Sequence, residues 1–300
     1  MPFEVSLLSD DGSALLKLRE YLSAHPHCVV SGGESLYSNP DTDVQFLWSL
    51  NASPTRSEIA RLNIGHFRPS AFAAEAAMTL KALALQVRLA VRETRTGHPI
   101  DCLSDPAQLV RAYCASVQAA MGGARQSRFE FARSFHEDRH KLDSIWQWNF
   151  ARNDLADELG ENLSVPLIRL FLLDGTLKAG VVWNDGNPMV CPRVDIVLLH
   201  RSAFAPVSDW LGRRQPVTEV LDIEEFETDY APWFSAVSPG ALAYSANDLS
   251  GLIRNIVARP ARRQVGSGLR VVPFRHMIDR EFLLEAGIAN GIHQRATPAT

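Results

Sequence analysis

Two apolar runs joined by Asp174-Gly175 constrain the fold of this chain more than any other feature. The runs occupy residues 167–173 and 176–183, and a third apolar run follows at 194–199. An Asp-Gly pair suits a two-residue type I′ turn, because that turn needs a positive φ at both central positions. The pattern therefore predicts a three-stranded antiparallel meander. Since its outer strands are apolar almost throughout, we expect helices to pack against both of its faces.

The composition is that of an ordinary globular protein. Of the 300 residues, 46% are hydrophobic and 21% are charged, which is enough apolar material for one large domain or two smaller ones. The formal net charge of -4 disfavours general binding to nucleic acid, because neutralising phosphates needs an excess of Lys and Arg. The first residues lack a secretory signal pattern, and no apolar run approaches the ~20 residues of a membrane span. We therefore expect neither nucleic acid nor a membrane as partner.

The cysteines are scattered along the chain and never form a C-x-x-C pair. This spacing indicates neither a zinc ribbon nor a disulfide scaffold. The expectation is a cytoplasmic protein that needs no cofactor. The four residues are Cys28, Cys102, Cys114 and Cys191.

The first hundred residues alternate between strand and helix patterns. The pattern predicts, in order, strand 3–7, helix 15–22, strand 43–50, strand 60–64, helix 72–84 and strand 85–91. The order β-α-β-β-α-β is that of a ferredoxin-like split βαβ unit. Gly32-Gly33 is interpreted as a turn, and residues 92–99 are interpreted as a linker that ends this domain.

The remaining sequence predicts a helical segment followed by a second α+β unit around the meander. Helices are expected around Leu109–Met121, at 143–159 and at 247–257. The chain is thus predicted to be an α+β protein with a ferredoxin-like domain at 1–99, a helical and antiparallel-sheet domain at 100–286, and a flexible tail at 287–300.

One motif points to metal chemistry. His136, Glu137 and His140 match H-E-x-x-H, which on a helix places two imidazoles on one face to bind zinc, with the glutamate as general base. Glu158 or Glu161 lies at a downstream distance suitable for a third ligand. However, the two intervening residues are charged, whereas the motif helix of such enzymes is usually buried. A solvated helix or loop is the alternative interpretation.

Other candidate reactive groups have simpler explanations. Cys191 and His200 could supply a thiol and a base, but Cys191 precedes Pro192 at the start of a strand, where a buried structural thiol is expected. Asp174 and Asp185 could form a carboxylate pair, but each precedes a glycine in a turn. No G-x-S-x-G, Walker or G-x-G-x-x-G pattern occurs.

An acidic segment from Glu219 to Asp229 suggests a binding surface, because negative charge beside aromatic side chains is typical of protein interfaces. A charged rim around ordinary core aromatics would give the same pattern, so both interpretations stay open. The candidate partner-binding residues are Glu219, Glu224, Glu225, Glu227, Tyr230 and Trp233.

Three further passages stand out: Tyr37-Ser38-Asn39-Pro40-Asp41-Thr42, Phe67-Arg68-Pro69-Ser70, and Val181-Val182-Trp183 followed by Pro188-Met189. Together they resemble a large group of bacterial cytosolic proteins that occur as divergent paralogues. The likeness spans about residues 3–199. Groups of this kind are often similar in character to immunity proteins, so the resemblance implies, by analogy, a protein that neutralises a toxin by covering its active site. It supplies no catalytic residue.

These observations lead to two hypotheses. The first is a non-enzymatic cytoplasmic protein that binds another protein, as an immunity protein binds its cognate toxin. The second is a zinc-dependent hydrolase with His136 and His140 as ligands and Glu137 as base. A structural or regulatory component of a larger assembly is a third possibility that the sequence does not separate from the first.

Overall fold

The protein is described by a computed structural model. It describes residues 2–50, 57–123, 135–160, 163–183, 189–200, 207–208, 214–215, 218–230, 233–238, 241–244, 251, 256 and 268–287. The predicted helix at 247–257 and the predicted tail beyond residue 287 lie almost entirely outside these residues.

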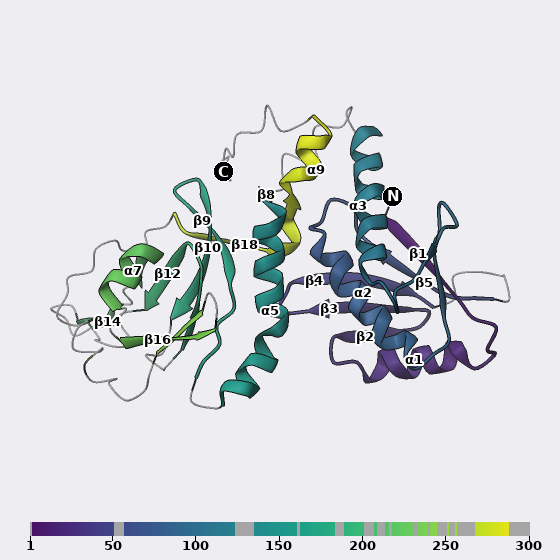
Figure 1. Cartoon of the computed structure of the whole chain (residues 1–300), viewed down its shortest axis with the longest axis horizontal. Coiled ribbons are helices and arrows are strands. Elements are labelled where there is room, and N and C mark those ends of the chain that lie inside the picture. The colour runs from purple at the N-terminus through teal and green to yellow at the C-terminus, as the bar shows by residue number, and fades with distance from the viewer. Residues whose placement is uncertain are drawn as a thin grey trace. The chain divides into compact units, whose positions relative to one another are not determined.

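The chain forms two compact units, and each is described by itself (Figure 1). The first unit runs through Trp146 and resumes at Phe274. The second unit extends from Gln147 to Pro273. The division therefore falls within the long helix α5 (Arg139–Leu159).

The first unit contains strands and helices that alternate along the chain. Its strands are β1 (Phe3–Leu8), β2 (Cys28–Ser31), β3 (Glu34–Asn39), β4 (Val44–Ser49), β5 (Glu58–Ile64), β6 (Ala90–Glu93), β7 (Pro99–Ile100), β8 (Phe135–Glu137) and β19 (Met277–Asp279). Its other elements, besides the start of α5, are α1 (Ala14–Ala24), α2 (Ala71–Ala84), α3 (Ala107–Gly123), the 3₁₀ turn η4 (Phe274–His276) and α9 (Arg280–Glu285).

Seven of these strands form one antiparallel sheet in the order β2-β3-β4-β5-β1-β6-β7. The sheet confirms an α+β architecture, but three of its features differ from the predictions. The hairpin β2–β3 flanks Gly32-Gly33, where only a turn was expected. Residues 85–87 continue from α2 as a turn, so the predicted strand at 85–91 begins instead at Ala90. Residues 92–99 are not a linker, because they form the β6–β7 hairpin inside the sheet.

Helices cover one face of this sheet. Across five neighbouring strands, Ser35, Trp48, Leu62, Val5 and Glu93 lie in register, and all five are buried. Their neighbours along the strands alternate to the other face, as a period of two requires. Helix α2 contacts this buried face through hydrogen bonds to β3, and α3 contacts it through an aromatic pair with β1.

The end of the described chain completes the first unit. Strand β19 pairs in parallel with β8, and Arg275 Nη1 donates to Asp43 Oδ1 at 2.7 Å. Asp279 is fully buried and accepts hydrogen bonds from the Ser70 amide at 3.1 Å and from Arg139 Nε at 2.9 Å. The first unit is thus built from two stretches that are far apart in sequence.

The second unit contains β9 (Arg169–Leu173), β10 (Thr176–Trp183), β11 (Val190–Pro192), β12 (Ile196–His200), β13 (Val207–Ser208), β14 (Arg214–Gln215), β15 (Thr218–Asp222), helix α7 (Ile223–Tyr230), β16 (Phe234–Ser238), β17 (Ala241–Tyr244) and β18 (Arg270–Val272). Its largest sheet has the order β15-β12-β10-β9-β18.

The predicted hairpin is confirmed, but the predicted meander is wrong at its third strand. Strands β9 and β10 pair antiparallel around Asp174 (φ 50°) and Gly175 (φ 80°). Strand β12 instead pairs with β10 in parallel. The connection between β10 and β12 contains β11, which pairs with β17 in a separate sheet. The chain therefore leaves the five-stranded sheet after β10 and re-enters it at β12, which runs in the same direction as β10.

Among the described residues, no helix is both long and apolar enough to cross a membrane.

Candidate functional site

Helix α7 carries most of the predicted partner-binding residues. Asp222, Glu224 and Glu227 are exposed on it or at its start, and we call these three residues the α7 acidic surface. Glu225 is half-buried and accepts a hydrogen bond from the Asp222 amide at 3.4 Å. The helix contains no Lys or Arg, so its own side chains do not neutralise this charge.

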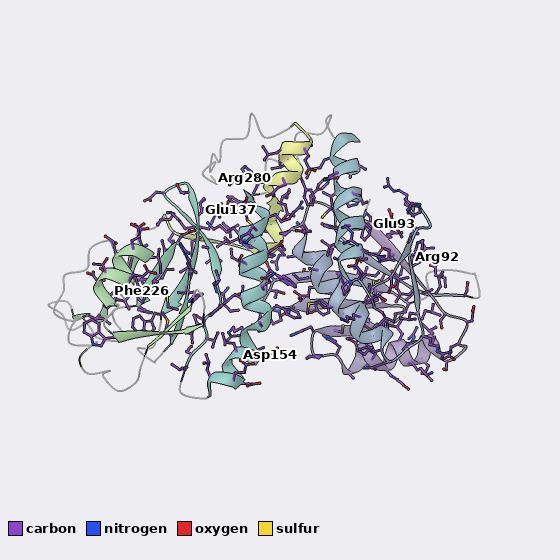
Figure 2. The ribbon with its side chains drawn as sticks, viewed as in Figure 1. Arg92, Glu93, Glu137, Asp154, Phe226 and Arg280 are labelled. Carbon is purple, nitrogen blue, oxygen red and sulfur yellow. The ribbon has the colours of Figure 1, made fainter. Side chains whose placement is uncertain are left out.

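The other predicted residues belong to the core. Glu219 on β15 is 4% exposed and Tyr230 at the end of α7 is 2% exposed. The ring of Phe226, labelled in Figure 2, lies 5.3 Å from that of Tyr230 and 6.2 Å from that of Trp183. Trp233 is half-buried. The structure therefore divides the predicted set, because the charges of α7 face outward whereas Glu219 and Tyr230 serve the fold.

The H-E-x-x-H pentapeptide does not lie on one helix. His136 and Glu137 belong to β8, whereas His140 lies in the first turn of α5. Asp138 stands between them and caps the helix, since its Oδ1 accepts a hydrogen bond from the His140 amide at 2.9 Å. The two imidazoles therefore extend from different elements instead of one helical face.

Glu137, the predicted general base, is held by two cations. Its Oε1 accepts a hydrogen bond from Arg280 Nη2 at 2.8 Å, and its Oε2 lies 3.5 Å from Lys141 Nζ. Figure 2 labels Glu137 and Arg280, which come from β8 and α9. These contacts give Glu137 a structural role in joining β8 to α9.

Of the two proposed third ligands, the structure describes only Glu158. Glu158 is eighteen residues beyond His140 on the same helix, or about 27 Å at 1.5 Å per residue. Glu161 lies outside the described residues. Among the residues that the structure describes, no group of three His, Cys, Asp or Glu side chains is placed to hold a metal ion.

Two of the other candidate reactive groups, Cys191 and Asp174, also have structural roles. Cys191 on β11 is 2% exposed, and its thiol donates to the Pro192 carbonyl at 3.6 Å. Burial raises the pKa of Cys191 to about 12, so the thiol stays protonated at neutral pH. His200 ends β12 in a different sheet. Asp174 occupies the hairpin turn, and Asp185 lies outside the described residues.

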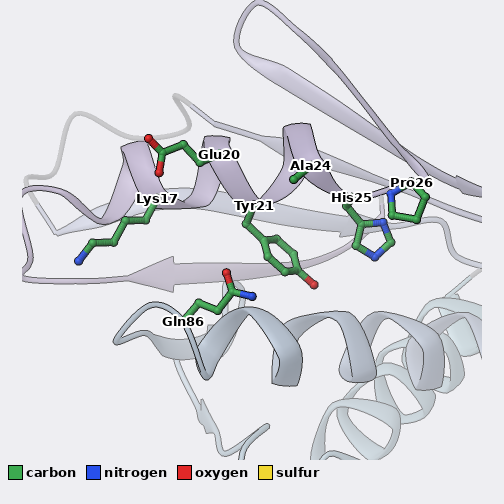
Figure 3. A pocket seen from close by; sticks show the side chains of 7 residues that line it. All are labelled: Lys17, Glu20, Tyr21, Ala24, His25, Pro26 and Gln86. Atoms are coloured by element: carbon green, nitrogen blue, oxygen red, sulfur yellow. The ribbon is translucent and has the colours of Figure 1, made fainter.

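An open groove of about 500 Å³ lies between α1 and the residues that follow α2 (Figure 3). Lys17 is the one Lys or Arg among the described residues that line it, and its Nζ is paired with Asp11 at 2.9 Å. Burial lowers the pKa of His25, whose Nδ1 accepts the amide of His27 at 3.2 Å. The described lining therefore presents no acid and base in contact. Its residues are Lys17, Glu20, Tyr21, Ala24, His25, Pro26 and Gln86.

Comparison with known protein families, with characterised proteins and with solved structures finds no match to this chain. The resemblance of the three sequence passages therefore stays a proposal.

One recessed surface of the first unit, between the β6–β7 hairpin and α3, is not predicted by the sequence patterns. Arg95, His98 and Arg111 line it. The interpretation of residues 92–99 as a linker gave no reason to expect a recess there. A usable signal was the glycine at position 97, whose φ of 72° permits the tight hairpin turn that carries Arg95 and His98.

Proposed function

We propose that this chain is a non-enzymatic binding protein whose α7 acidic surface recognises a basic surface of another protein, as an immunity protein covers the active site of its toxin. The observation that carries the proposal is the exposure of Asp222, which precedes α7, and of Glu224 and Glu227 on α7, whose Phe226 and Tyr230 are buried. Such charges steer association and fix the orientation of the partner. A toxin that acts on nucleic acid would present a complementary basic site.

The roles of the other ionisable groups support binding over catalysis. Glu75, Glu137 and Asp279 each accept hydrogen bonds within the fold. Glu75 is held by neutral side chains, and Glu137 and Asp279 are held by arginines, so the contacts of all three serve the fold. The resemblance to divergent bacterial paralogues adds the toxin-neutralising role.

The proposal extends to the finer fold and the location. The chain order β1-α1-β4-β5-α2-β6 supports a ferredoxin-like unit that is enlarged by the β2–β3 hairpin and by β7. All four cysteines are free thiols, which supports a reducing cytoplasm.

Affinity capture with a charge-reversal pair tests this function. The full chain and its Glu224→Lys/Glu227→Lys variant are immobilised and exposed to a lysate of the native host at low ionic strength. We expect the unmodified chain to capture a basic protein that the variant does not capture. Adding one equivalent of the chain should then abolish the toxic activity of that protein.

The matched control is Asp157→Lys/Glu158→Lys, which makes the same charge change at two exposed positions of α5. It should capture the same protein as the unmodified chain. The Glu224→Lys change removes a favourable interaction with the N-terminus of α7 worth up to about 1 kcal/mol, so a thermal melt must show that the variant is folded. Equal capture by all three chains would remove the α7 acidic surface from the proposal.

A further inference from the structure

The recess between the β6–β7 hairpin and α3 has the dimensions of a small-ligand site. Its volume is about 380 Å³, and sites for small molecules begin near 300 Å³. Ile100 is buried and provides an apolar lining with Pro99. Ala112 and Ala115 of α3 also line the recess, and their short side chains leave space between the helix and the hairpin.

Two arginines reach this recess from different elements. Arg95 extends from the hairpin turn and Arg111 from α3, with side chains 64% and 63% exposed. Among the described residues, Arg95 meets a carboxylate only through Nε, at 3.7 Å from Glu93. Arg111 is held by Asp105 through Nη2. Each guanidinium is thus oriented by a carboxylate while keeping N–H donors for a ligand.

The carboxylates that hold the arginines are already occupied. Glu93 is 8% exposed, and its Oε2 accepts a hydrogen bond from Thr96 Oγ1 at 2.7 Å. Asp105 also accepts the amide of Ala107 at 3.2 Å. Asp105 does not line the recess, whereas Glu93 does and shares its charge between Arg95 and Thr96.

Further donors surround the same space. His98 is exposed in the hairpin turn. Gln108 uses its Oε1 to accept the amide of Asp101 at 2.9 Å, which leaves its NH₂ group as a donor. Burial, followed by nearby positive charge that includes Arg95, lowers the pKa of the neighbouring His66. The described lining therefore gathers two guanidinium groups and further N–H donors around a single carboxylate, that of Glu93.

We propose that this recess binds the phosphate group of a small phosphate monoester, with Arg95 and Arg111 on the phosphate oxygens and the organic group against Pro99 and Ile100. Arginine suits this task because its planar fork of donors matches two phosphate oxygens at once. The inference goes beyond the proposed protein-binding function and does not rest on it.

A titration followed by NMR tests the inference on the full chain. Inorganic phosphate and phenyl phosphate are added separately at pH 8 and constant ionic strength, and the backbone amide shifts are recorded. We expect saturable shifts in residues 93–100 and 107–116. Phenyl phosphate should bind at least about threefold more tightly, because its ring removes apolar surface from water. Equal affinities would overturn the assignment to a monoester.

Variants separate this site from general surface charge. Arg95→Gln/Arg111→Gln should weaken binding at least about tenfold, and Arg95→Gln alone should give an intermediate loss. The matched control is Arg88→Gln/Arg92→Gln, which removes two exposed arginines that do not line the recess (Figure 2 labels Arg92 beside Glu93). It should bind within about twofold of the unmodified chain. The proposal is overturned by an absence of saturable binding or by an equal loss in the control.

Discussion

At the scale of single residues, the carboxylate of Glu75 is fully buried in α2 and is held by neutral donors alone among the described residues. Its Oε1 accepts hydrogen bonds from Tyr37, Asn39 and Thr42, at 2.7, 2.8 and 3.1 Å. Its Oε2 accepts one from Trp146 Nε1 at 2.7 Å. Burial and the adjacent carboxylate raise the pKa of Tyr37, so its hydroxyl stays a donor. This network joins β3, α2 and α5.

Replacing Glu75 by Gln should destabilise the protein by about 2 kcal/mol. The amide can still accept the three bonds at Oε1, but its NH₂ group would face the N–H of Trp146, so two donors would oppose each other. Urea denaturation measures the effect. The exposed Glu20→Gln change on α1 is the control, with an expected loss below about 0.5 kcal/mol. Equal stability of the Glu75→Gln variant and the unmodified chain would show that the network contributes nothing.

The raised pKa of Asp143 predicts that the stability of the protein depends on pH. Burial, and then the charge of Asp279, raise its pKa from 3.8 to about 6, although Arg139, Ser70 and His140 act in the opposite direction. Because the folded state binds this proton more readily than the unfolded state, stability should rise as the pH falls from 7 through 6 toward 4.

Asp143→Asn removes this dependence, because the amide is neutral at every pH. We expect the variant to be more stable than the unmodified chain by about 1 to 2 kcal/mol at pH 7.5, after allowing for the partial exposure of the site. The difference should shrink to about a third of this value at pH 4.5 and vanish only below the unfolded-state pKa of 3.8. Denaturant midpoints at the two pH values provide the measurement, and a pH-independent difference would show that Asp143 does not titrate in this range.

The sequence predicts the apolar residues of this core but not its polar network. Alternation correctly places Val44, Phe46 and Trp48 on the buried face of β4. Glu75, by contrast, stands in an Ala-rich helix where an exposed glutamate is the default expectation. Its donors lie 33 to 71 residues away, so only the tertiary fold reveals why it is buried.

At the scale of elements, local turn chemistry was sufficient for the hairpin but not for the pairing of its neighbours. Asp174-Gly175 fixes β9 against β10 through two consecutive positive φ angles. Strands β10 and β12 pair in parallel, and between them the chain contains β11, a three-residue strand that pairs in another sheet. Gly180 also closely approaches Ile196, where a Cβ on the glycine would lie 2.7 Å from Cγ1. The periodicity of the strands indicates neither the pairing of β11 nor the close approach of Gly180 to Ile196.

Because the H-E-x-x-H pentapeptide spans the junction of β8 and α5, we predict that it does not bind zinc tightly. His136 and His140 belong to different elements, and Glu137 is paired with Arg280. Protein purified without a metal-affinity tag should contain well under one zinc per chain, and His136→Ala should leave that content unchanged. Metal analysis of the two proteins gives the answer. Near-stoichiometric zinc that disappears in the variant would instead support the hydrolase hypothesis.

At the scale of the whole molecule, the compact units do not follow the chain in sequence order. The stretch from residue 100 to Trp146 groups with the first sheet, and the chain returns to the same unit from Phe274. Arg275, Asp279 and Arg280 make the ion pairs that hold this return. Their partners, Asp43, Arg139 and Glu137, are 140 or more residues earlier, a separation that local sequence patterns do not register.

The candidate binding site could be predicted only in part, because local sequence patterns do not show which residues long-range contacts bury. The acidic character of α7 is local in sequence, and Glu224 and Glu227 are exposed as a binding surface requires. The burial of Glu219 and Tyr230 depends on the sheet that β15 joins. The sequence alone therefore did not separate the exposed acidic residues of α7 from the buried residues beneath them.

The measurement that most directly tests the protein-binding function is the association rate between this chain and its captured partner, as a function of ionic strength. We expect the rate to fall steeply as salt is added, because screening weakens steering by the α7 acidic surface. Glu224→Lys/Glu227→Lys should slow association about tenfold or more at low salt, while Asp157→Lys/Glu158→Lys should not. Association that is independent of salt and equal in all three chains would show that this surface does not bind the partner.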